Sequence, residues 1–483
     1  MNLITKFNSV TRSSAALFAA LLCLGADLAK GQEQISLPQA IEIALQNNLQ
    51  VKQVQLSEAL SKEDLRQSQL NLYPSVSGST SLNFNFGRSV DPLSYQFVNQ
   101  QISNSNGNLF ASVTLFQGFQ KLNQISQNKL LLEADKSNTR KVRNDLALSV
   151  ATAYLQILSS QDLHTAAQQQ LKLAQQQLKN EEQQFNVGNK TTADLSQSRA
   201  QVANAELNVT NAQNSLDIAY LNLAQLMERD PNKPFEIVRP VVDELKQLNT
   251  AYSATEVYTK AAQNYPDIKL AEFNRLAAAK AVQVAKGNLY PRLDLQGSLG
   301  TGWSSNRNSV IGVGPAETVQ IGFVEGTNQA VFTQNFNPIL DRTSFSRQLN
   351  ENFNQAIGFS LSIPIFNNFN SRISVRRAKL TLQSYEASEQ LAKNNLNKVI
   401  SQAVQDLRAA EKRFASAQSA FKSSQEAFNA IQQRYGVGLV NSLDLNQAQT
   451  NFNKAEFDLI QARYDLIFRS KVIDFYLGNP LTF

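Results

Sequence analysis

Residue types that carry much of protein chemistry are scarce in this 483-residue sequence, which has one cysteine, one histidine and one tryptophan. A structural zinc site takes four ligands, mostly Cys and His, so the lone Cys23 and His164 cannot assemble one. The sequence also has no phosphate-binding loop, no G-x-S-x-G element and no H-E-x-x-H helix. We therefore predict that the protein is not an enzyme and binds no metal or cofactor. Lysine and arginine are scattered despite a net charge of +6, which argues against a nucleic-acid partner.

Long apolar runs are also missing. The apolar run near the N-terminus, Ala15–Leu24, is too short to span a bilayer as a helix, and no later segment has the required length and apolarity. A lysine and an arginine precede this run and small residues follow it, which is the order of a secretory signal peptide. We predict a signal peptide over residues 1–31. Cys23 lies in the run without the small preceding residue of a lipoprotein site, so we expect it to be removed with the signal peptide.

Glycine and proline are absent from two stretches, Gln120–Asn186 and Ser371–Tyr435. A helix of about 66 residues spans roughly 100 Å, far more than a helix of a globular domain. In the first stretch, the residues at every seventh position are mostly large and apolar. A small residue lies three positions after most of them. The large series is Val150, Ile157, His164, Leu171, Leu178 and Phe185, and the small series is Ala153, Ser160, Ala167 and Ala174. This period of seven predicts supercoiled helices in close contact, as in a coiled coil or helical tube.

The same motifs occur in both halves of the chain. Leu72-Tyr73-Pro74 recurs as Leu289-Tyr290-Pro291, and Phe185-Asn186-Val187-Gly188 recurs as Tyr435-Gly436-Val437-Gly438. The offsets are 217 (289 − 72) and 250 (435 − 185), so the second half contains an insertion, which we place in the polar stretch Ser304–Gln355. The sequence therefore predicts one architectural unit that is used twice, each time with its own variable loop.

Before each long helix, the spacing at which apolar residues recur changes from seven positions to two. In the first half, Val76, Gly78, Thr80, Leu82, Phe84 and Phe86 alternate with serine and asparagine. Such alternation predicts a strand with one apolar and one polar face, and we expect four such strands of about ten residues, the length of a membrane-spanning strand. Soluble hairpins with one solvated face are the alternative. Four strands cannot close a useful barrel and an open sheet cannot lie in lipid, so a membrane location requires several chains to share one barrel.

We predict two repeats after the signal peptide. The first covers residues 32–252, with a helix over 38–72, strands over 74–86 and 109–116, a long helix over 120–186, a helix over 193–228 and a connector over 229–252. The second covers residues 253–483, with a helix over 254–288, strands over 292–303 and 356–366, a long helix over 371–435, a helix over 443–477 and a short tail.

The order and duplication of these motifs resemble the TolC family of outer-membrane efflux proteins. Phe116-Gln117-Gly118-Phe119 and Phe366-Asn367-Asn368-Phe369, after the second strand of each repeat, belong to this resemblance, which covers residues 36–478. It implies an α+β membrane protein: a homotrimer in which each chain gives four strands to one twelve-stranded outer-membrane β-barrel, continued by a long periplasmic α-helical barrel. It also implies an exit duct of a tripartite efflux pump or type I secretion system. Its partners would be outer-membrane lipid, a periplasmic adaptor (membrane fusion protein) and an inner-membrane transporter of RND, ABC or MFS type.

By the same resemblance, the periplasmic tip of the tube lies at the two glycine breaks. The resemblance assigns the pore gate to Asp444 and Gln447 and a tether to Asp194 and Tyr435. It assigns the adaptor-docking tip to Gly188, Asn189, Gly438 and Leu439. Gln447 and Val440 stand where the best-known member of the family has an aspartate and an arginine, so the gate loses charge here. Alternatively, Asp194 and Asp444 are first-turn acids that complement the helix dipole.

A second class of function is compatible with the same patterns, a non-channel coiled-coil scaffold of the periplasm or cell envelope. Heat-stable trimers in outer-membrane extracts would indicate the channel, and release by a salt wash would indicate the scaffold. The transported substrate cannot be read from these motifs.

Overall fold

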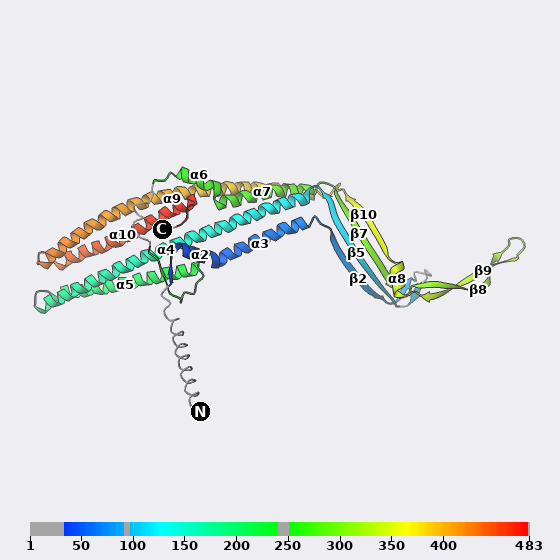
Figure 1. Ribbon diagram of the computed structural model, residues 1–483, viewed down its shortest axis with the longest axis horizontal. Helices are drawn as coiled ribbons and strands as arrows, with labels where there is room; N and C mark the ends of the chain where they lie inside the picture. The colour runs from blue at the N-terminus through cyan, green and yellow to red at the C-terminus, as the bar shows by residue number, and fades with distance from the viewer. Residues whose placement is uncertain (1–32, 91–96, 100, 240–250, 482–483) are drawn as a thin grey trace, which may run out of the picture. The chain divides into compact units, whose positions relative to one another are not determined.

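A computed structural model describes residues 33–90, 97–99, 101–239 and 251–481 (Figure 1). The predicted signal peptide and Cys23 lie outside these residues. The chain forms two compact units, each built from separate stretches. The first, here called the helical unit, contains the residues up to Ser61, Leu131–Arg275 and Tyr385–Phe483. The second, here called the sheet unit, contains Lys62–Leu130 and Leu276–Ser384.

The helices of the two repeats correspond in order and length. The first repeat contains α2 (Leu37–Asn47), α3 (Leu49–Leu70), α4 (Gln120–Asn186) and α5 (Thr192–Leu226). The second contains α6 (Ala254–Asn264), α7 (Pro266–Gly287), α9 (Asn370–Gly436) and α10 (Ser442–Leu477). α2 and α6 each have 11 residues, α3 and α7 each have 22, and α4 and α9 each have 67. The internal duplication is therefore confirmed in the structure.

The predictions of one helix over 38–72 and one over 254–288 are wrong, because each segment is divided near its start. Tyr265 has ψ 127°, since the ring of Pro266 keeps the preceding residue out of the helical region. Asn48 has the same ψ of 127°, and its side-chain oxygen accepts hydrogen bonds from the amides of Gln50 and Val51 at 2.9 and 3.3 Å. An asparagine cap therefore starts α3 where a proline starts α7.

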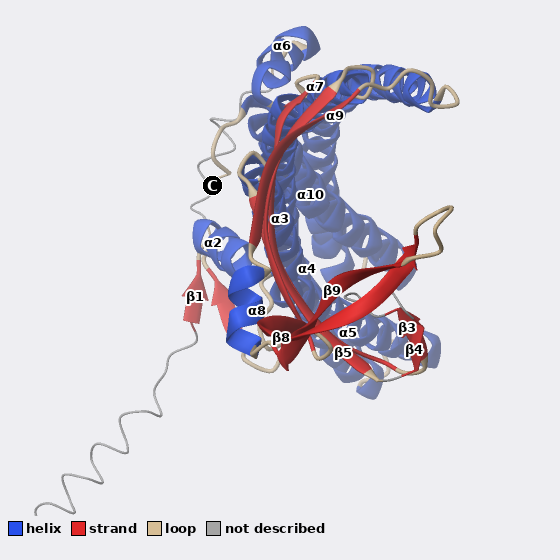
Figure 2. Ribbon diagram, turned by 90° about the vertical axis from the view of Figure 1, so that its right-hand side faces the viewer, coloured by secondary structure: helices blue, strands red, loops and turns tan. Residues whose placement is uncertain are grey.

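Four strands form one antiparallel sheet in the order β10-β7-β5-β2. They are β2 (Ser75–Asn85), β5 (Ile102–Gln117), β7 (Arg292–Ser304) and β10 (Asn354–Ser362). Figure 2 shows the sheet as a curved band. β2 and β10 are its edges, and among the described strands neither has a partner on its outer side. β10 ends sooner than the predicted 356–366, because Pro364 has no N–H to donate to a ladder. β5 begins seven residues before the predicted 109 (109 − 102).

The register places most apolar residues of the four strands on one face of the sheet. Val76 pairs with Ala111, Ala111 with Gly297, and Gly297 with Ile357. Phe359 pairs with Leu295 two residues further along. The other face is polar and includes Asn83, Asn104, Asn106, Asn108, Gln296 and Ser360. In the single chain the apolar face is open, with Ile357 80% and Phe359 71% exposed. A contiguous apolar face of this kind requires lipid or protein to cover it.

The insertion of the second repeat, expected as a loop over Ser304–Gln355, is folded. It contains the hairpin β8 (Asn308–Phe323) and β9 (Ala330–Arg342) and the short helix α8 (Phe345–Glu351). α8 packs against the end of β7, where the Thr301 hydroxyl donates to the carbonyl of Leu349 at 2.6 Å and the buried Gln348 side chain bonds both the amide and the carbonyl of Ser304. The shorter counterpart in the first repeat contains the small hairpin β3 (Arg88–Val90) and β4 (Phe97–Asn99).

The junction between sheet and long helix has one conformation in both repeats. The pairs Gly118-Phe119 and Asn368-Phe369 have φ between 53° and 60°, the left-handed region. Asparagine tolerates this region better than most residues. A Cβ on Gly118 would also lie 2.8 Å from the carbonyl oxygen of Gly287, so the first repeat requires glycine here.

The helical unit contains one main apolar core for each repeat. In the first core, Tyr154 of α4 donates to the carbonyls of Ile35 and Val238, at 3.1 and 2.6 Å, beside the parallel pair β1 (Glu33–Ile35) and β6 (Phe235–Ile237). The second core joins Leu407 of α9 to Ile473 of α10. Three residues of α10 pack against the first core: Tyr464, Ile467 and Phe468. The long helices therefore follow the order α9, α10, α4, α5 across this unit (Figure 1).

Candidate functional site

Both long helices end at a glycine with left-handed backbone. φ is 79° at Gly188 and 75° at Gly438. The next residue in each turn donates its amide back to the last helical turn, Asn189 to the carbonyl of Gln184 and Leu439 to that of Arg434, each at 2.9 Å. A Cβ on either glycine would meet nothing within 4 Å. The left-handed backbone conformation therefore explains why glycine occupies both positions. The space beside these glycines of the predicted docking tip is open. We call the two turns, with the first residues of α5 and α10, the tip.

The two return helices begin with side-chain caps. The Asp194 amide donates to the Thr191 hydroxyl at 3.2 Å, and the Thr191 amide donates to the Asp194 carboxylate at 3.1 Å. Asn441 accepts from the amide of Asp444 at 2.8 Å. Both aspartates thus occupy the first turn of a helix, where a negative charge complements the dipole. Gln447, one turn after Asp444, donates along its own helix to Asn451 at 3.1 Å.

Asp194 also joins the two repeats. Its carboxylate accepts a hydrogen bond from the hydroxyl of Ser442, the first residue of α10, at 2.7 Å. This bond and those from Thr191 lower the pKa of Asp194 to about 2. The counterpart of Asp194 in the second repeat, Asp444, is exposed in the single chain.

Tyr435 has a different partner from the one that the family resemblance implied. Its hydroxyl donates to the carboxylate of Glu181 on α4, not to Asp194. Lys190, in the first turn of the tip, donates to the same hydroxyl at 2.7 Å and lies 4.2 Å from the centre of the tyrosine ring. Burial, the bond to Glu181 and the negative charge nearby all raise the pKa of Tyr435. The tyrosine is therefore a neutral hydrogen-bond donor at physiological pH.

Glu181 is a contact residue of the tip that the sequence analysis did not single out. Its side chain is 3% exposed, and the ammonium of Lys190 lies 3.8 Å from its Oε2 atom. A buried carboxylate is stable only when it is paired and hydrogen-bonded, so Tyr435 and Lys190 are needed together. We name Glu181, Lys190 and Tyr435 the tip latch. It connects α4 and the first turn to the end of α9, that is, one repeat to the other.

An apolar cluster supports the tip latch from the side of the helices. Phe428, Leu445 and Ala448 are buried, and Leu173 of α4 and the ring of Tyr435 pack against them. The rings of Phe428 and Phe452 are stacked, with centroids 5.4 Å apart and planes 5° apart. α4 is thus fixed against the hairpin of α9 and α10 near the tip.

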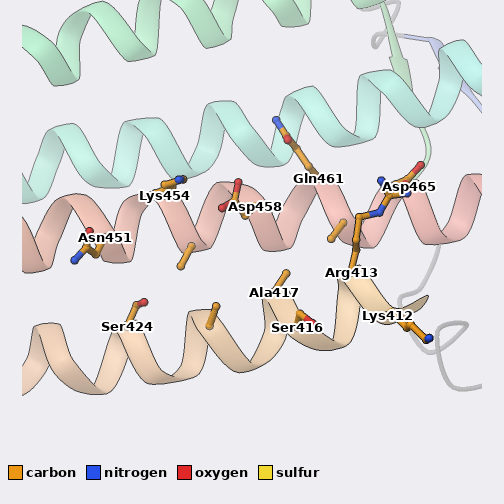
Figure 3. A pocket seen from close by; sticks show the side chains of 13 residues that line it. Lys412, Arg413, Ser416, Ala417, Ser424, Asn451, Lys454, Asp458, Gln461 and Asp465 are labelled. Carbon is orange, nitrogen blue, oxygen red and sulfur yellow. The ribbon is translucent and has the colours of Figure 1, made fainter. Parts of the chain in front are cut away.

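Further from the tip, a groove of about 1020 Å³ runs between α9 and α10 (Figure 3). Small and charged side chains line it: Ser416, Ala417, Ala420, Ser424, Ala455 and Ala462, with Lys412, Arg413, Lys454, Asp458 and Asp465. One end is closed by an ion pair of Arg413 with Asp465 at 2.7 Å. Small residues along a groove allow the close approach of another helix.

The sequence matches the outer membrane efflux protein family over residues 40–228 and 257–479. The chain belongs to this family. Outer membrane efflux protein BepC of Brucella suis is 20% identical over 469 residues, which cover 96% of this chain and 90% of the relative. Outer membrane protein TolC of Escherichia coli is 22% identical over 336 residues, which cover 69% of this chain and 61% of the relative.

Solved structures of efflux proteins share the fold. CusC superposes with a TM-score of 0.74 at 17% identity over 92% of each chain. VceC of Vibrio cholerae superposes with a TM-score of 0.71 at 16% identity, over 92% of this chain and 96% of VceC. With the family match, these similarities confirm the prediction of an outer-membrane efflux duct and its location. Family membership also favours the channel over the coiled-coil scaffold.

The family and its fold are those of channel proteins rather than enzymes. No helix among the described residues has the length and apolarity needed to cross a membrane. Within the described ranges, no three His, Cys, Asp or Glu side chains are grouped to hold a metal ion. His164 is half-buried on α4 and bonds Gln168 of the same helix at 3.3 Å.

Proposed function

We propose that three copies of this chain form one efflux channel, in which each chain contributes four strands to an outer-membrane barrel and four helices to a periplasmic tube. The observation that carries the proposal is the sheet β10-β7-β5-β2, whose two edges have no partner among the described strands and whose apolar face is open in the single chain. Lipid is the natural cover for that face, and lipid tolerates a sheet only when it is closed. Closure around a three-fold axis gives each free edge a partner.

Transport through such a duct requires a polar wall, and the second face of the sheet provides it. Asparagine, serine and glutamine side chains line that face, so a closed barrel places them in the lumen. Near the helical end of β7, Asp294 pairs with Arg292 at 2.8 Å and accepts from Thr114 at 2.8 Å. Three such groups give the lumen a ring of paired charges, which favours passage of hydrophilic and mixed cargo.

The tip is the proposed gate and docking end of the tube. Asp444 and Gln447 lie on the return helix that follows the second turn, and three copies of Asp444 form a negative ring there. The tip latch holds the two hairpins of one chain together and replaces the tether first expected between Asp194 and Tyr435. Asn189 and Leu439 of the turns are exposed, as a docking surface for a periplasmic adaptor requires. An inner-membrane transporter completes the pump.

The experiment that tests the proposal is extraction from the outer membrane, followed by mass measurement and planar-bilayer recording. We expect a particle of three times the mass of the mature chain, resistant to a salt wash, that gives discrete conductance steps. A salt-released protein that gives no conductance would instead identify the coiled-coil scaffold.

A further inference from the structure

The two junctions between sheet and helices share one backbone conformation but differ in charge. The offsets of the duplication, 217 for the short helices and 250 for the long ones, relate residues 279–289 and 370–380 to 62–72 and 120–130. The second-repeat segments contain six lysines and arginines and no acidic residue, a net charge of +6. The first-repeat segments contain four basic and two acidic residues, a net charge of +2 (4 − 2). The shared conformation of the junction therefore does not require the additional charge.

Four of the six basic residues lie in the first turns of α9 and are exposed: Arg372, Arg376, Arg377 and Lys379. Positive charge at the start of a helix opposes the helix dipole, so the stability of α9 does not explain them. The nearest carboxylate along the helix, Glu386, is seven residues after Lys379 (386 − 379). The next ion pair of α9 joins Lys393 to Glu389 at 2.6 Å, and no ion pair among the described residues includes any of the four. Their charge therefore lacks a counter-ion within the described chain.

Aromatic contacts place the first of these arginines beside the apolar face of the sheet. Phe116 belongs to that face, and its ring packs edge-on against the ring of Phe119, with centroids 5.5 Å apart. Phe366 and Phe369 repeat this pair in the second junction, with centroids 5.6 Å apart and the same interplanar angle of 86°. The guanidinium of Arg372 lies 5.6 Å from the centre of the Phe369 ring. Arg372 is therefore on the side that a barrel turns toward lipid.

Arg376 and Lys379 continue the side of α9 that Arg372 begins. They follow Arg372 by four and seven residues, about one and two helical turns, whereas Arg377 lies about 100° around the helix from Arg376. We call Arg372, Arg376 and Lys379 the basic stripe. It is about 10 Å long, and one headgroup layer of a bilayer is roughly 5 to 8 Å thick. The basic stripe therefore spans the headgroups when the aromatic pair lies at their border with the hydrocarbon.

The helical end of the sheet also has the tyrosines of a membrane boundary. Tyr73 precedes β2 and Tyr290 precedes β7, and their side chains are 70% and 55% exposed. Tyrosine is enriched at membrane–water interfaces, where its ring lies at the level of the headgroups. Because α9 begins at this same end of the sheet, its basic stripe lies where phospholipid phosphates are expected.

We propose that the basic stripe binds the headgroup of an anionic phospholipid in the leaflet of the outer membrane that faces the periplasm. This inference rests on the proposed barrel and assigns a lipid to its second-repeat junction. Arginine binds phosphate oxygens through two parallel N–H···O bonds, and three unpaired positive charges favour a headgroup with net negative charge over a zwitterionic one. In the first repeat, Leu122 and Ser126 are the counterparts of Arg372 and Arg376. A trimer therefore has three such sites, one in each chain.

Retention of lipid by purified trimers tests the site. Trimers in detergent are mixed with dioleoyl phosphatidylglycerol or dioleoyl phosphatidylcholine, and the bound lipids are counted by native mass spectrometry. We expect three retained phosphatidylglycerol molecules per trimer. Arg372→Gln/Arg376→Gln should retain this lipid at least tenfold more weakly, because each basic residue near an anionic surface contributes about fivefold in affinity. Arg377→Gln/Lys422→Gln removes the same charge from exposed positions outside the basic stripe and is expected to bind like the unchanged protein. An excess of inorganic phosphate, which would occupy a site for free anions, is expected not to displace the lipid.

Transfer of the basic stripe to the first repeat tests the site by a gain of binding. Leu122→Arg/Ser126→Arg completes a second stripe with Lys129, the counterpart of Lys379. The number of retained phosphatidylglycerol molecules is expected to rise from three to six per trimer. Trimers that retain both lipids equally, release phosphatidylglycerol to inorganic phosphate, or gain no lipid in this variant overturn the lipid site alone. Equal weakening by the stripe and control variants does the same. An unchanged protein that forms no trimer overturns the proposed channel and this site together.

Discussion

The hydroxyl of Tyr435 donates a hydrogen bond to the buried carboxylate of Glu181, across the boundary between the two repeats. Lys190 donates to the same hydroxyl and completes the ion pair. Separation of this carboxylate from its partners is costly, because a buried charge would be left unpaired. Both partners lie on other segments of the tip. Any opening that separates α4 from the end of α9 must break this contact.

Removal of the tyrosine hydroxyl is expected to loosen the tip. Tyr435→Phe leaves the ring in its apolar cluster but removes a hydrogen bond to a charged group, which contributes about 1.5 to 3 kcal/mol. We expect a higher single-channel conductance in planar bilayers than that of the unchanged protein. Tyr385→Phe, on the exposed part of α9, is the matched control and is expected to leave conductance unchanged. Equal conductance of Tyr435→Phe and the unchanged channel would show that the latch does not restrain the tip.

Acid is expected to weaken the contact between Asp194 and Ser442. The pKa of Asp194 is lowered to about 2 from its ordinary value of 3.8, so this contact stabilises the closed tip above the ordinary value and is lost as the pH falls through about 2. Ser442→Ala removes the largest cause of the shift and brings the pKa back toward 3.8. Because this variant lacks the contact at every pH, its conductance should already be raised at neutral pH and should rise less than that of the unchanged protein as the pH falls through about 2. Equal conductance of the two proteins at neutral pH would argue against the contact.

The charge of Asp444 is expected to set ion selectivity. Three like carboxylates around one axis attract cations and divalent ions. Asp444→Asn should lower cation selectivity and divalent block with little change in conductance, measured by reversal potentials in salt gradients. Asp458→Asn, an exposed aspartate further along α10, is the control. If Asp444→Asn changes neither property, the aspartate does not face the constriction, and its place in the first turn of α10 is explained by the helix dipole.

Adaptor contact is expected at the turns rather than along the helices. Cysteine at Asn189 or Leu439, both exposed in the turns, should crosslink to a cysteine at the hairpin tip of the adaptor in whole cells. Lys172→Cys, at mid-helix on α4, is the comparison. Crosslinks that appear at Lys172 and not at the turns would place the adaptor along the tube.

Much of the helical part could be predicted because its signals are local and repeated. A period of seven, two stretches without glycine or proline and the glycine turns are sufficient to define α4, α5, α9 and α10. Side-chain capping is harder to foresee, and Asn48 divides a helix that its neighbours would continue. The insertion after β7 was missed as a folded element because β8 and β9 pair only with each other, without the strict alternation of the barrel strands.

Glu181 illustrates why the site was only partly predictable. It stands three residues after Leu178, where the four earlier members of the seam are Ala153, Ser160, Ala167 and Ala174. A carboxylate at a position otherwise held by small residues is a detectable signal of a buried pair. Its partners, however, lie nine and 254 residues away (190 − 181 and 435 − 181), and spacing alone does not choose between Glu181 and Asp194.

The claim that three chains share one lipid-embedded barrel is tested most directly by placing a charge on either face of β10. Ile357 lies on the apolar face near the middle of β10, and arginine near mid-membrane costs about 2 to 4 kcal/mol per chain, a cost that a trimer bears three times. Ala356, the adjacent residue, lies on the polar face. We predict that Ile357→Arg abolishes heat-resistant trimers in the outer membrane while Ala356→Arg retains them. Normal trimer yield from Ile357→Arg, or equal loss from both variants, would contradict the shared barrel.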